Sequence, residues 1–323
     1  MKILFIHQGM SPFIENDLHI LQESYEVKDF SFEGVRSIFS LIKEVKRCDL
    51  TFSWFGSIHA FWAVLFSRIF YKRSIVVAGG YDVGQEDGLW SQPLKSWCPR
   101  YVFSKADKIL TVSNFCSKEA LKHLKLEPKR VKMIYHGFDH SKYSRSSMEL
   151  KENMVLTISQ IAEHQIKRKG LDLFIQTAAL MRGTHFIIVG PWLDNSVKSL
   201  KRIASSNVTF TGGLSEAELI NYASRAKVYL QTSRHEAFGC SLAEAMLCEC
   251  VPVVTRYGAL PEVVGDCGLY VDSFSPDEIA EKVKEAAARQ KELGPKARQR
   301  VIERFPLEER KKQLLGVIES LKI

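Results

Sequence analysis

The chain has 323 residues, of which 46% are hydrophobic and 25% charged, with a formal net charge of +8. This length suits two domains, and the composition is that of an ordinary soluble globular protein. The basic excess comes without an aromatic-basic motif, which argues against nucleic-acid binding. No apolar stretch is long enough to cross a bilayer.

The first half alternates short apolar runs with helical patterns, which is typical of a parallel sheet covered by helices. We expect strands at 3–7, 50–54, 74–78, 108–112 and 132–135, and helices near 14–23, 36–47, 58–71, 92–104 and 114–124. Trp62, Phe66 and Phe70 recur at four-residue spacing in the most apolar of these segments. That stripe fits either core packing or a membrane-touching face.

A polar stretch from 140 to 153 has the character of a linker, and the alternation then restarts. We expect strands at 154–159, 184–190, 208–211, 228–231, 251–255 and 268–271, and helices near 169–181, 195–204, 215–225, 240–249, 259–264 and 276–291. An amphipathic segment, 307–321, follows a helix-breaking proline and can turn back toward the first half. The predicted domains are 1–148 and 149–305, with 306–323 as a C-terminal helix that packs on the first. Both are doubly wound α/β domains facing a cleft, where the carboxyl ends of parallel strands bind ligands.

The segment from 233 to 262 carries the most chemistry. Glu236 and Glu244 stand eight positions apart around a Phe238-Gly239 turn that leads into a helix. Free backbone N–H groups at a helix N-terminus suit a phosphate. Carboxylates repel phosphate and are better suited to accept hydrogen bonds from hydroxyl groups. Phosphate and hydroxyls together indicate a nucleotide sugar, although two ordinary surface carboxylates are the alternative.

These residues resemble a known family. Glu236-Ala-Phe-Gly-Cys-Ser-Leu-Ala-Glu244 is similar to the E-x7-E motif of retaining family-4 glycosyltransferases, which have the GT-B fold. Further landmarks fall in the family's order, namely Ala106-Asp-Lys-Ile-Leu-Thr-Val-Ser113, Tyr135-His-Gly-Phe-Asp139, Lys169-Gly-Leu-Asp172, Val189-Gly-Pro191, Val208-x-Phe-x-Gly212 and Gly258-Ala-Leu-Pro-Glu262. The resemblance covers nearly the whole chain and is dense after residue 105.

The resemblance implies a role for each matching residue. Glu244 is expected to bind the ribose hydroxyls of the donor, and Glu236 the hydroxyls of its sugar. Lys169 is expected to neutralise the leaving diphosphate, because a fixed cation stabilises the charge that develops there. The remaining donor contacts are expected from Ala237, Phe238, Gly239 and Cys240, and from Gly9 at the end of the first strand, where glycine permits a close approach. No D-x-D pair occurs, so no obligatory metal or cofactor is expected.

Two departures from the family pattern affect the site. The family's Gly-Arg before Lys-Gly is replaced by Ser159-Gln160, so either Arg168 or Lys167 substitutes for the arginine, or phosphate binding is weaker. A solvated charge run is the other explanation of these cations. Where the family often has a histidine, this chain has the segment Gly79-Gly-Tyr-Asp-Val83. Asp82 is the candidate for the polar group near the reacting carbon, and the alternative is that it is a turn residue beside the glycines.

The resulting prediction is a retaining, metal-independent hexosyltransferase acting on a saccharide or lipid-linked acceptor. The alternative is a non-catalytic subunit that binds a nucleotide sugar, which the missing Gly-Arg favours. Seven scattered cysteines and a strand-like start without a secretory leader indicate reduced thiols. We therefore expect a cytoplasmic protein, or one peripheral on the inner membrane face.

Overall fold

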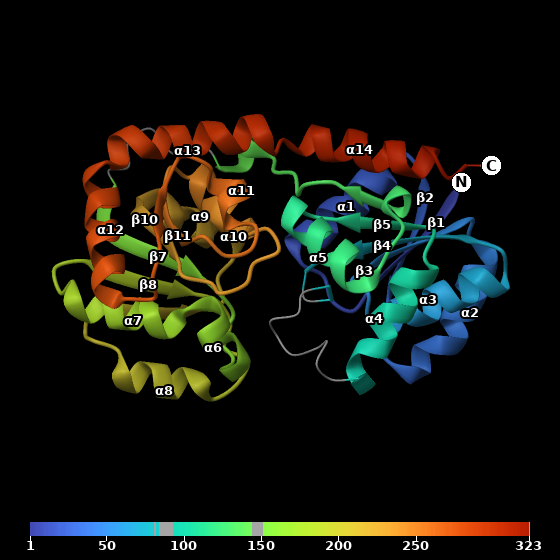
Figure 1. The fold of residues 1–323 in the computed structure, drawn as a ribbon, viewed down its shortest axis with the longest axis horizontal. Helices are drawn as coiled ribbons and strands as arrows, with labels where there is room; N and C mark the ends of the chain where they lie inside the picture. Colours follow the sequence, from blue (N-terminus) through green and yellow to red (C-terminus); the bar gives the residue numbers. More distant parts are fainter. Residues whose placement is uncertain (81, 84–92, 144–150, 323) are drawn as a thin grey trace. The chain divides into compact units, whose positions relative to one another are not determined.

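Two parallel sheets, each of six strands, organise the chain (Figure 1). The computed structural model describes residues 1–80, 82–83, 93–143 and 151–322. Contacts divide the chain into a first unit, Met1–Gly137 with Leu307–Ile323, and a second unit, Phe138–Pro306. The domain boundary predicted at 148/149 lies outside the described residues. The predicted α/β class with two doubly wound domains is confirmed.

The sheet of the first unit has the strand order β2-β1-β3-β4-β5-β6. Its strands are β1 (Lys2–His7), β2 (Glu26–Ser31), β3 (Leu50–Trp54), β4 (Arg73–Ala78), β5 (Lys108–Thr111) and β6 (Val131–Met133). Its helices are α1 (Pro12–Gln22), α2 (Ile38–Arg47), α3 (Ile58–Ile69), α4 (Pro93–Lys105), α5 (Asn114–Leu124) and α14 (Leu307–Glu319). Strand β3 is buried throughout, because helices cover both of its faces, although its sequence alternates apolar residues with the buried polar residues Thr51 and Ser53.

The sheet of the second unit has the order β12-β11-β10-β7-β8-β9. Its strands are β7 (Glu152–Ile158), β8 (His185–Val189), β9 (Val208–Gly212), β10 (Ala226–Gln231), β11 (Val251–Thr255) and β12 (Leu269–Val271). Its helices are α6 (Glu163–Lys169), α7 (Leu171–Leu180), α8 (Ser196–Ile203), α9 (Glu216–Arg225), α10 (Cys240–Leu247), α11 (Leu260–Val264), α12 (Pro276–Ala288) and α13 (Gln290–Arg304). The core of this unit lies between the sheet and helices α7, α8 and α12.

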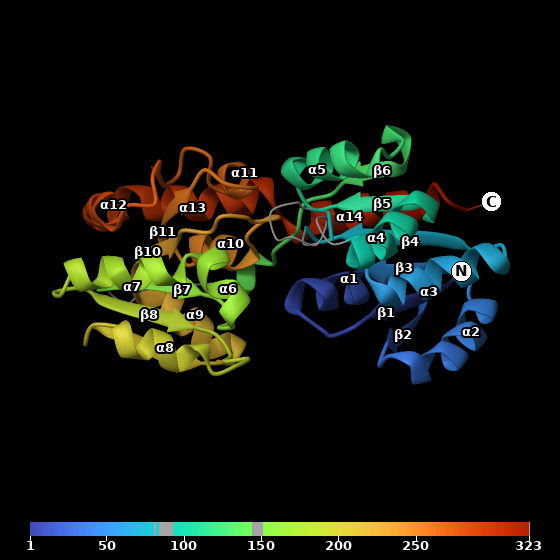
Figure 2. The same cartoon turned by 60° about the horizontal axis from the view of Figure 1, so that its bottom comes forward.

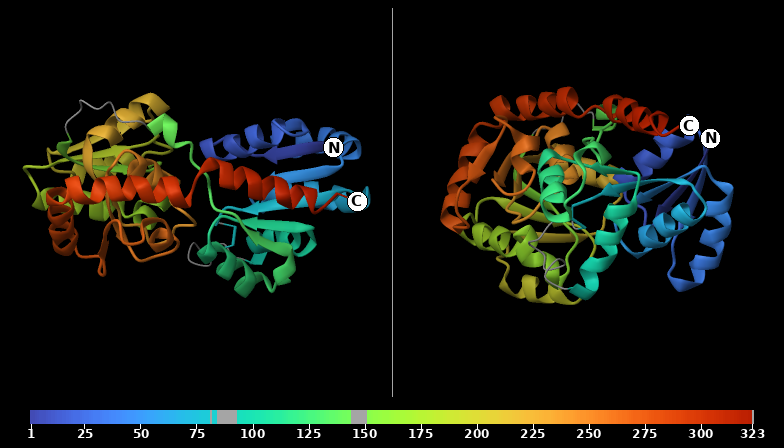
Figure 3. Two further views of the ribbon diagram at one scale, coloured as in Figure 1. Left: turned by 90° about the horizontal axis from the view of Figure 1, so that it is seen from above. Right: turned by 45° about the vertical axis from the view of Figure 1, so that its right-hand side comes forward.

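Helix α14 packs within the first unit, although it follows the second unit in sequence (Figure 3). The guanidinium of Arg310 makes two 2.6 Å hydrogen bonds to the carboxylate of Asp17 on α1. A further Arg310 N–H donates to the carbonyl oxygen of Tyr135 at 2.8 Å. Both side chains of the pair are almost completely buried, so removal of either would leave a buried charge without its counter-ion.

Three elements lack the sequence signal from which the others were predicted. Strand β2 is a half-exposed edge strand without an apolar run. Helix α6 has no buried residue, and α13 contains a proline at position 295. These elements form because of their neighbours, since local propensity alone does not specify them.

The aromatic stripe of α3 belongs to the core. Phe66 is buried, and Trp62 and Phe70 pack against a cluster that includes Leu41 and Val45 of α2. Helices α2 and α3 lie side by side (Figure 2), which explains why α3 is apolar around most of its circumference. No helix in the described part of the chain is long and apolar enough to span a membrane.

Candidate functional site

Two predicted site residues form an ion pair in the second unit. Lys169, the last residue of α6, places Nζ 2.6 Å from Oε1 and 2.9 Å from Oε2 of Glu236, which follows β10. The exposed fractions of the two side chains are 21% and 11%. Because the pair is largely shielded from water, its two charges hold one another in a fixed geometry.

Gly170 positions Lys169. It takes a left-handed conformation with φ of 69°, which ends α6 and begins α7. A Cβ at this position would lie 2.2 Å from Oγ1 of Thr232, whose hydroxyl donates to the Gly170 carbonyl oxygen at 3.1 Å. The N–H of Arg234 donates to the Arg168 carbonyl oxygen at 2.8 Å. The junction between α6 and α7 is therefore joined to the chain that leaves β10, and Lys169 meets Glu236 for that reason.

Gly258 supports Glu236 from the other side. Its φ is 65°, and a Cβ would lie 2.3 Å from the carbonyl oxygen of Glu236. The next residue, Ala259, donates its N–H to that same oxygen at 2.8 Å. The turn after β11 therefore packs directly on the Glu236 backbone. Glycine is needed there for two reasons, its left-handed φ and its lack of a side chain.

Helix α10 begins beside Glu236, with Gly239 as its N-cap at φ of 99°. Gly239 has no side chain, so the N-cap makes no side-chain hydrogen bond to the first N–H groups of the helix. The residue before it, Phe238, is buried against Phe138 and Phe305 with ring centroids 6.1 Å and 5.2 Å apart. The buried ring fixes the backbone of the turn, so Ala237, Phe238, Gly239 and Cys240 present a rigid amide-lined edge that suits an anion.

Glu244 lies one turn further along α10 and is half-buried. Burial, followed by the negative charge of Glu216, raises the pKa of its carboxyl group to about 7, while a hydrogen bond with Tyr143 opposes the rise. Tyr143 is itself buried. The sequence reading placed it in a polar linker and did not single it out. An aromatic residue within an otherwise polar and charged stretch was the signal available in the sequence.

The other two cations of α6 differ from Lys169. Lys167 is exposed, whereas Arg168 is half-buried and its Nε donates to Oε1 of Gln165 at 3.0 Å. All three lie in the last turn of α6, where cations interact favourably with the helix dipole. The predicted helix start at 169 is therefore corrected, because α6 precedes it and Lys169 is the end of that helix. Of the three cations of α6, Lys169 is the one for which the described part of the chain shows a hydrogen bond to Glu236.

Gly9 and Asp82 belong to the first unit. Gly9 follows β1 with φ of 147°, and its N–H donates to Nδ1 of His7 at 3.2 Å. Nothing lies within 4 Å of the position its Cβ would take. Asp82 is buried, and its two oxygens accept N–H groups of Gly56 at 2.7 Å and Gly80 at 2.9 Å. Burial raises its pKa to about 6. These contacts join the loops that follow β3 and β4.

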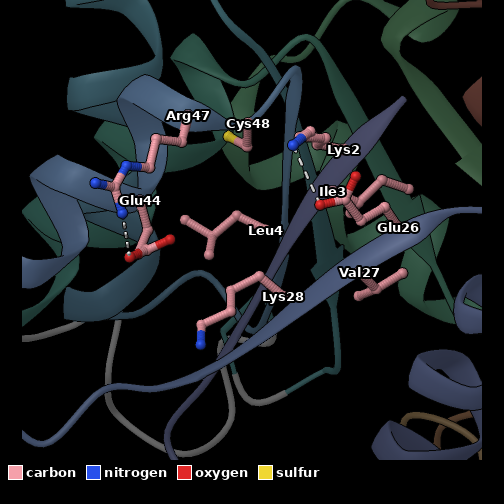
Figure 4. Close-up of a pocket in the computed structure, with 9 residues that line it drawn as sticks. All are labelled: Lys2, Ile3, Leu4, Glu26, Val27, Lys28, Glu44, Arg47 and Cys48. Carbon is pink, nitrogen blue, oxygen red and sulfur yellow. Dashed lines mark ion pairs between the residues drawn. The ribbon is translucent and has the colours of Figure 1, made fainter.

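A separate concavity of about 230 Å³ lies at the amino end of β1 in the first unit (Figure 4). Two ion pairs border it, Lys2 with Glu26 at 3.2 Å and Arg47 with Glu44 at 3.7 Å. None of the residues that line it was predicted for the site. Within the described residues, no cluster of three or more metal-ligating side chains occurs.

Residues 141–305 match the family model described as glycosyl transferases group 1. Among curated relatives, the MMP alpha-(1->4)-mannosyltransferase of Mycolicibacterium hassiacum is 24% identical over 249 residues, which are 72% of this chain and 60% of the relative. The phosphatidylinositol N-acetylglucosaminyltransferase gpi3 subunit of Schizosaccharomyces pombe is 23% identical over 172 residues, 51% of this chain and 37% of the relative. The matches thus span about half the length of these relatives.

The fold has solved counterparts. The crystal structure of Anabaena HepE in complex with UDP-glucose matches with a TM-score of 0.81 and 17% sequence identity. The match covers 99% of this chain and 100% of that one. At this level of identity the likeness establishes a common fold. It also agrees with the sheet order and the crossover helices of both units.

Proposed function

Since the chain belongs to the group 1 glycosyl transferases, we propose that it transfers a hexose from a nucleotide sugar to a hydroxyl group of a saccharide or lipid-linked acceptor. The transfer retains configuration and needs no metal ion. The observation that carries the proposal is the Lys169–Glu236 ion pair beside the start of α10, where the N-cap is Gly239. This arrangement combines groups for an anion with groups for hydroxyls in one small region.

The donor diphosphate binds at the first N–H groups of α10. Both the helix dipole and the fixed Lys169 ammonium favour negative charge there, and more so as the bond to the leaving group breaks. Glu236 accepts hydrogen bonds from the sugar hydroxyls, and Glu244 accepts them from the ribose. Glu236 also keeps Lys169 in place, so its carboxylate acts through orientation and charge.

The proposed reaction proceeds on one face of the sugar. The bond between the anomeric carbon and the phosphate oxygen breaks, and a bond from that carbon to the acceptor oxygen forms. The acceptor proton moves to the departing phosphate oxygen, so no protein base is required. Both oxygens of Glu236 are hydrogen-bonded to Lys169, which suits a carboxylate that positions hydroxyls better than one that attacks carbon.

Metal independence is supported by the cations available to the diphosphate. Lys169 is held in position by Glu236, and Arg168 is half-buried in the same helical turn. Of the two substitutes for the family arginine, Arg168 fits better, because Lys167 points to solvent. The resemblance also assigns Asp82 and Gly9 to the site. For Asp82, we propose that it acts by shaping the loops after β3 and β4, since both of its oxygens are used there.

The alternative, a non-catalytic subunit that binds a nucleotide sugar, rests on the replacement of Gly-Arg by Ser159-Gln160. A relative named as a subunit is consistent with it. The two functions differ in one assay, release of nucleoside diphosphate from a panel of nucleotide sugars. The enzyme releases it slowly even with water as acceptor, and Glu236→Ala slows the release by at least about tenfold. Tight donor binding without release by the unaltered chain, with or without saccharide acceptors, would favour the subunit.

A further inference from the structure

The outward face of α2 is cationic and bears bare apolar side chains. Of the residues from 35 to 47, those exposed to solvent are Val35, Arg36, Phe39, Ser40, Lys43, Lys46 and Arg47, which we call the α2 face. Val35 and Phe39 are 80% and 79% exposed. Four members of the face are cations and none is an acid. A helix surface that serves only solubility would mix both signs of charge.

The folding of α2 does not depend on this face. The opposite side of the helix supplies Leu41 and Val45 to the core of the first unit. Phe39 and Val35 take no part in that cluster, so their exposure leaves the core complete. Two large apolar side chains left in water beside four cations are typical of a surface that meets another phase or molecule.

The charges near the face remain predominantly positive when neighbouring elements are included. Glu44 is half-buried and pairs with Arg47 at 3.7 Å, and Glu33 and Asp49 are the exposed acids that flank the face in the sequence. Lys46 lies 5.0 Å from the ring centroid of Phe70. The end of α3 and the turn from it into β4 add further exposed groups of the same two kinds, namely Arg68, Ile69, Tyr71 and Arg73. Of these, Arg73 pairs with Asp107.

We propose that the α2 face binds the surface of an anionic lipid bilayer, with its cations at the lipid phosphates and Phe39 and Val35 inserted between headgroups. Basic residues are attracted to anionic headgroups, and an apolar side chain adds the second signal that stable peripheral binding needs. The face therefore fits a membrane better than a protein partner, for which a cationic surface without acids offers little specificity.

The position of the face suits the proposed function, on which this inference rests for its biological purpose. Because α2 begins after the carboxyl end of β2, Val35 and Phe39 lie toward the sheet edge where Gly9 follows β1. Ligands of parallel sheets bind beyond that edge. A bilayer touched by Phe39 would bring a lipid-linked acceptor to the correct edge of the first unit.

Co-sedimentation of the full chain with vesicles tests the proposal, without donor or acceptor. Phosphatidylcholine vesicles with phosphatidylglycerol should bind the chain, pure phosphatidylcholine vesicles should not, and added salt should weaken binding. Lys43→Glu with Lys46→Glu should lower the partition coefficient by at least about tenfold, and Phe39→Ser by about threefold or more. The matched controls are Lys284→Glu with Lys291→Glu, which makes the same charge change at exposed sites of the second unit, and Ile203→Ser.

Equal loss of binding in test and control variants would overturn the proposal, as would equal binding to both kinds of vesicle or to neither. So would tighter binding of duplex DNA that the same variants abolish, since the face would then serve nucleic acid. Donor hydrolysis is measured separately on every variant. A chain that binds vesicles but hydrolyses no donor would contradict the proposed function and leave membrane binding by the α2 face supported. A chain that hydrolyses donor but binds no vesicles would contradict membrane binding and leave the proposed function supported.

Discussion

The Lys169 ammonium and the Glu236 carboxylate are in contact at 2.6 Å, although 67 positions separate them in the chain. The contact joins the end of α6 to the loop after β10, and Gly170 and Gly258 are the residues that let these segments approach. The central claim follows from it, namely that a fixed cation and a fixed carboxylate stand beside the start of α10 to hold an activated sugar.

Removal of either partner of this pair should impair transfer. Lys169→Ala and Glu236→Ala are each expected to lower kcat/KM by at least about tenfold, the scale of one lost charged contact. Because the residues act together, the double variant should lose less than the product of the two single losses. Steady-state kinetics with the best donor measures this, and Lys167→Ala is the matched control, since Lys167 is exposed. Full activity in Lys169→Ala would remove the lysine from the mechanism.

Glu244 should set a pH dependence. Its pKa is raised from 4.5 to about 7 in the folded chain, so its contribution to stability is fully present below pH 4.5 and is lost as the pH rises through 7. Glu244→Gln cannot ionise, and it should therefore increase the unfolding free energy at about pH 8 by about 2 kcal/mol, with little gain at about pH 4.

The same substitution should weaken donor binding by about tenfold, because an amide is a poorer acceptor for ribose hydroxyls than a carboxylate. Calorimetry and thermal unfolding across pH measure both effects. A variant that loses stability at alkaline pH, or that binds donor as the unaltered chain does, would show that Glu244 is a structural residue.

Tyr143→Phe should act through Glu244. Loss of the hydroxyl removes the hydrogen bond that favours the ionised carboxylate, so the pKa of Glu244 should rise further. Donor affinity near neutral pH should fall a few-fold, and its pH profile should shift toward alkaline values. Tyr222→Phe is the control, because Tyr222 lies on α9 beside Arg225. An unchanged pH profile in Tyr143→Phe would contradict this role.

Gly258→Ala should disturb Glu236 through the backbone. The added methyl group would stand 2.3 Å from the Glu236 carbonyl oxygen at a left-handed φ, so the loop must move or the residue must change conformation. We expect a loss of about 2 kcal/mol in stability and a fall in donor affinity. Gly183→Ala is the matched control, with nothing within 4 Å of its Cβ position. Equal effects of the two substitutions in thermal unfolding and donor titration would refute the account of this turn.

Most of the fold could be predicted from the sequence. Many of the buried parallel strands appear as short apolar runs, and helices appear as capping residues followed by apolar residues at helical spacing. Two helix starts show such caps, a capping box at Ser215 and Glu218 and an N-cap at Ser113. Strand β2 and helix α6 were missed, because an exposed edge strand and a short helix whose one apolar residue is Ile166 have no apolar periodicity. Their existence depends on neighbours that a local pattern does not describe.

The candidate site shows the same limit. The motif residues could be named from the sequence, but the pairing of Lys169 with Glu236 depends on the left-handed turn at Gly170, which spacing alone does not specify. Tyr143 was missed because it approaches Glu244 from a segment that reads as a linker. Phe66 was ambiguous, since a buried stripe and a membrane-facing stripe share one spacing, and only its packing in the core decides between them.

A crystal structure of the chain soaked with a nucleotide sugar that it hydrolyses tests the central claim most directly. The account predicts the diphosphate on the first N–H groups of α10 beside Gly239, with Lys169 at its oxygens, sugar hydroxyls on Glu236 and ribose on Glu244. Donor density away from the start of α10, or with neither glutamate in contact, would contradict it.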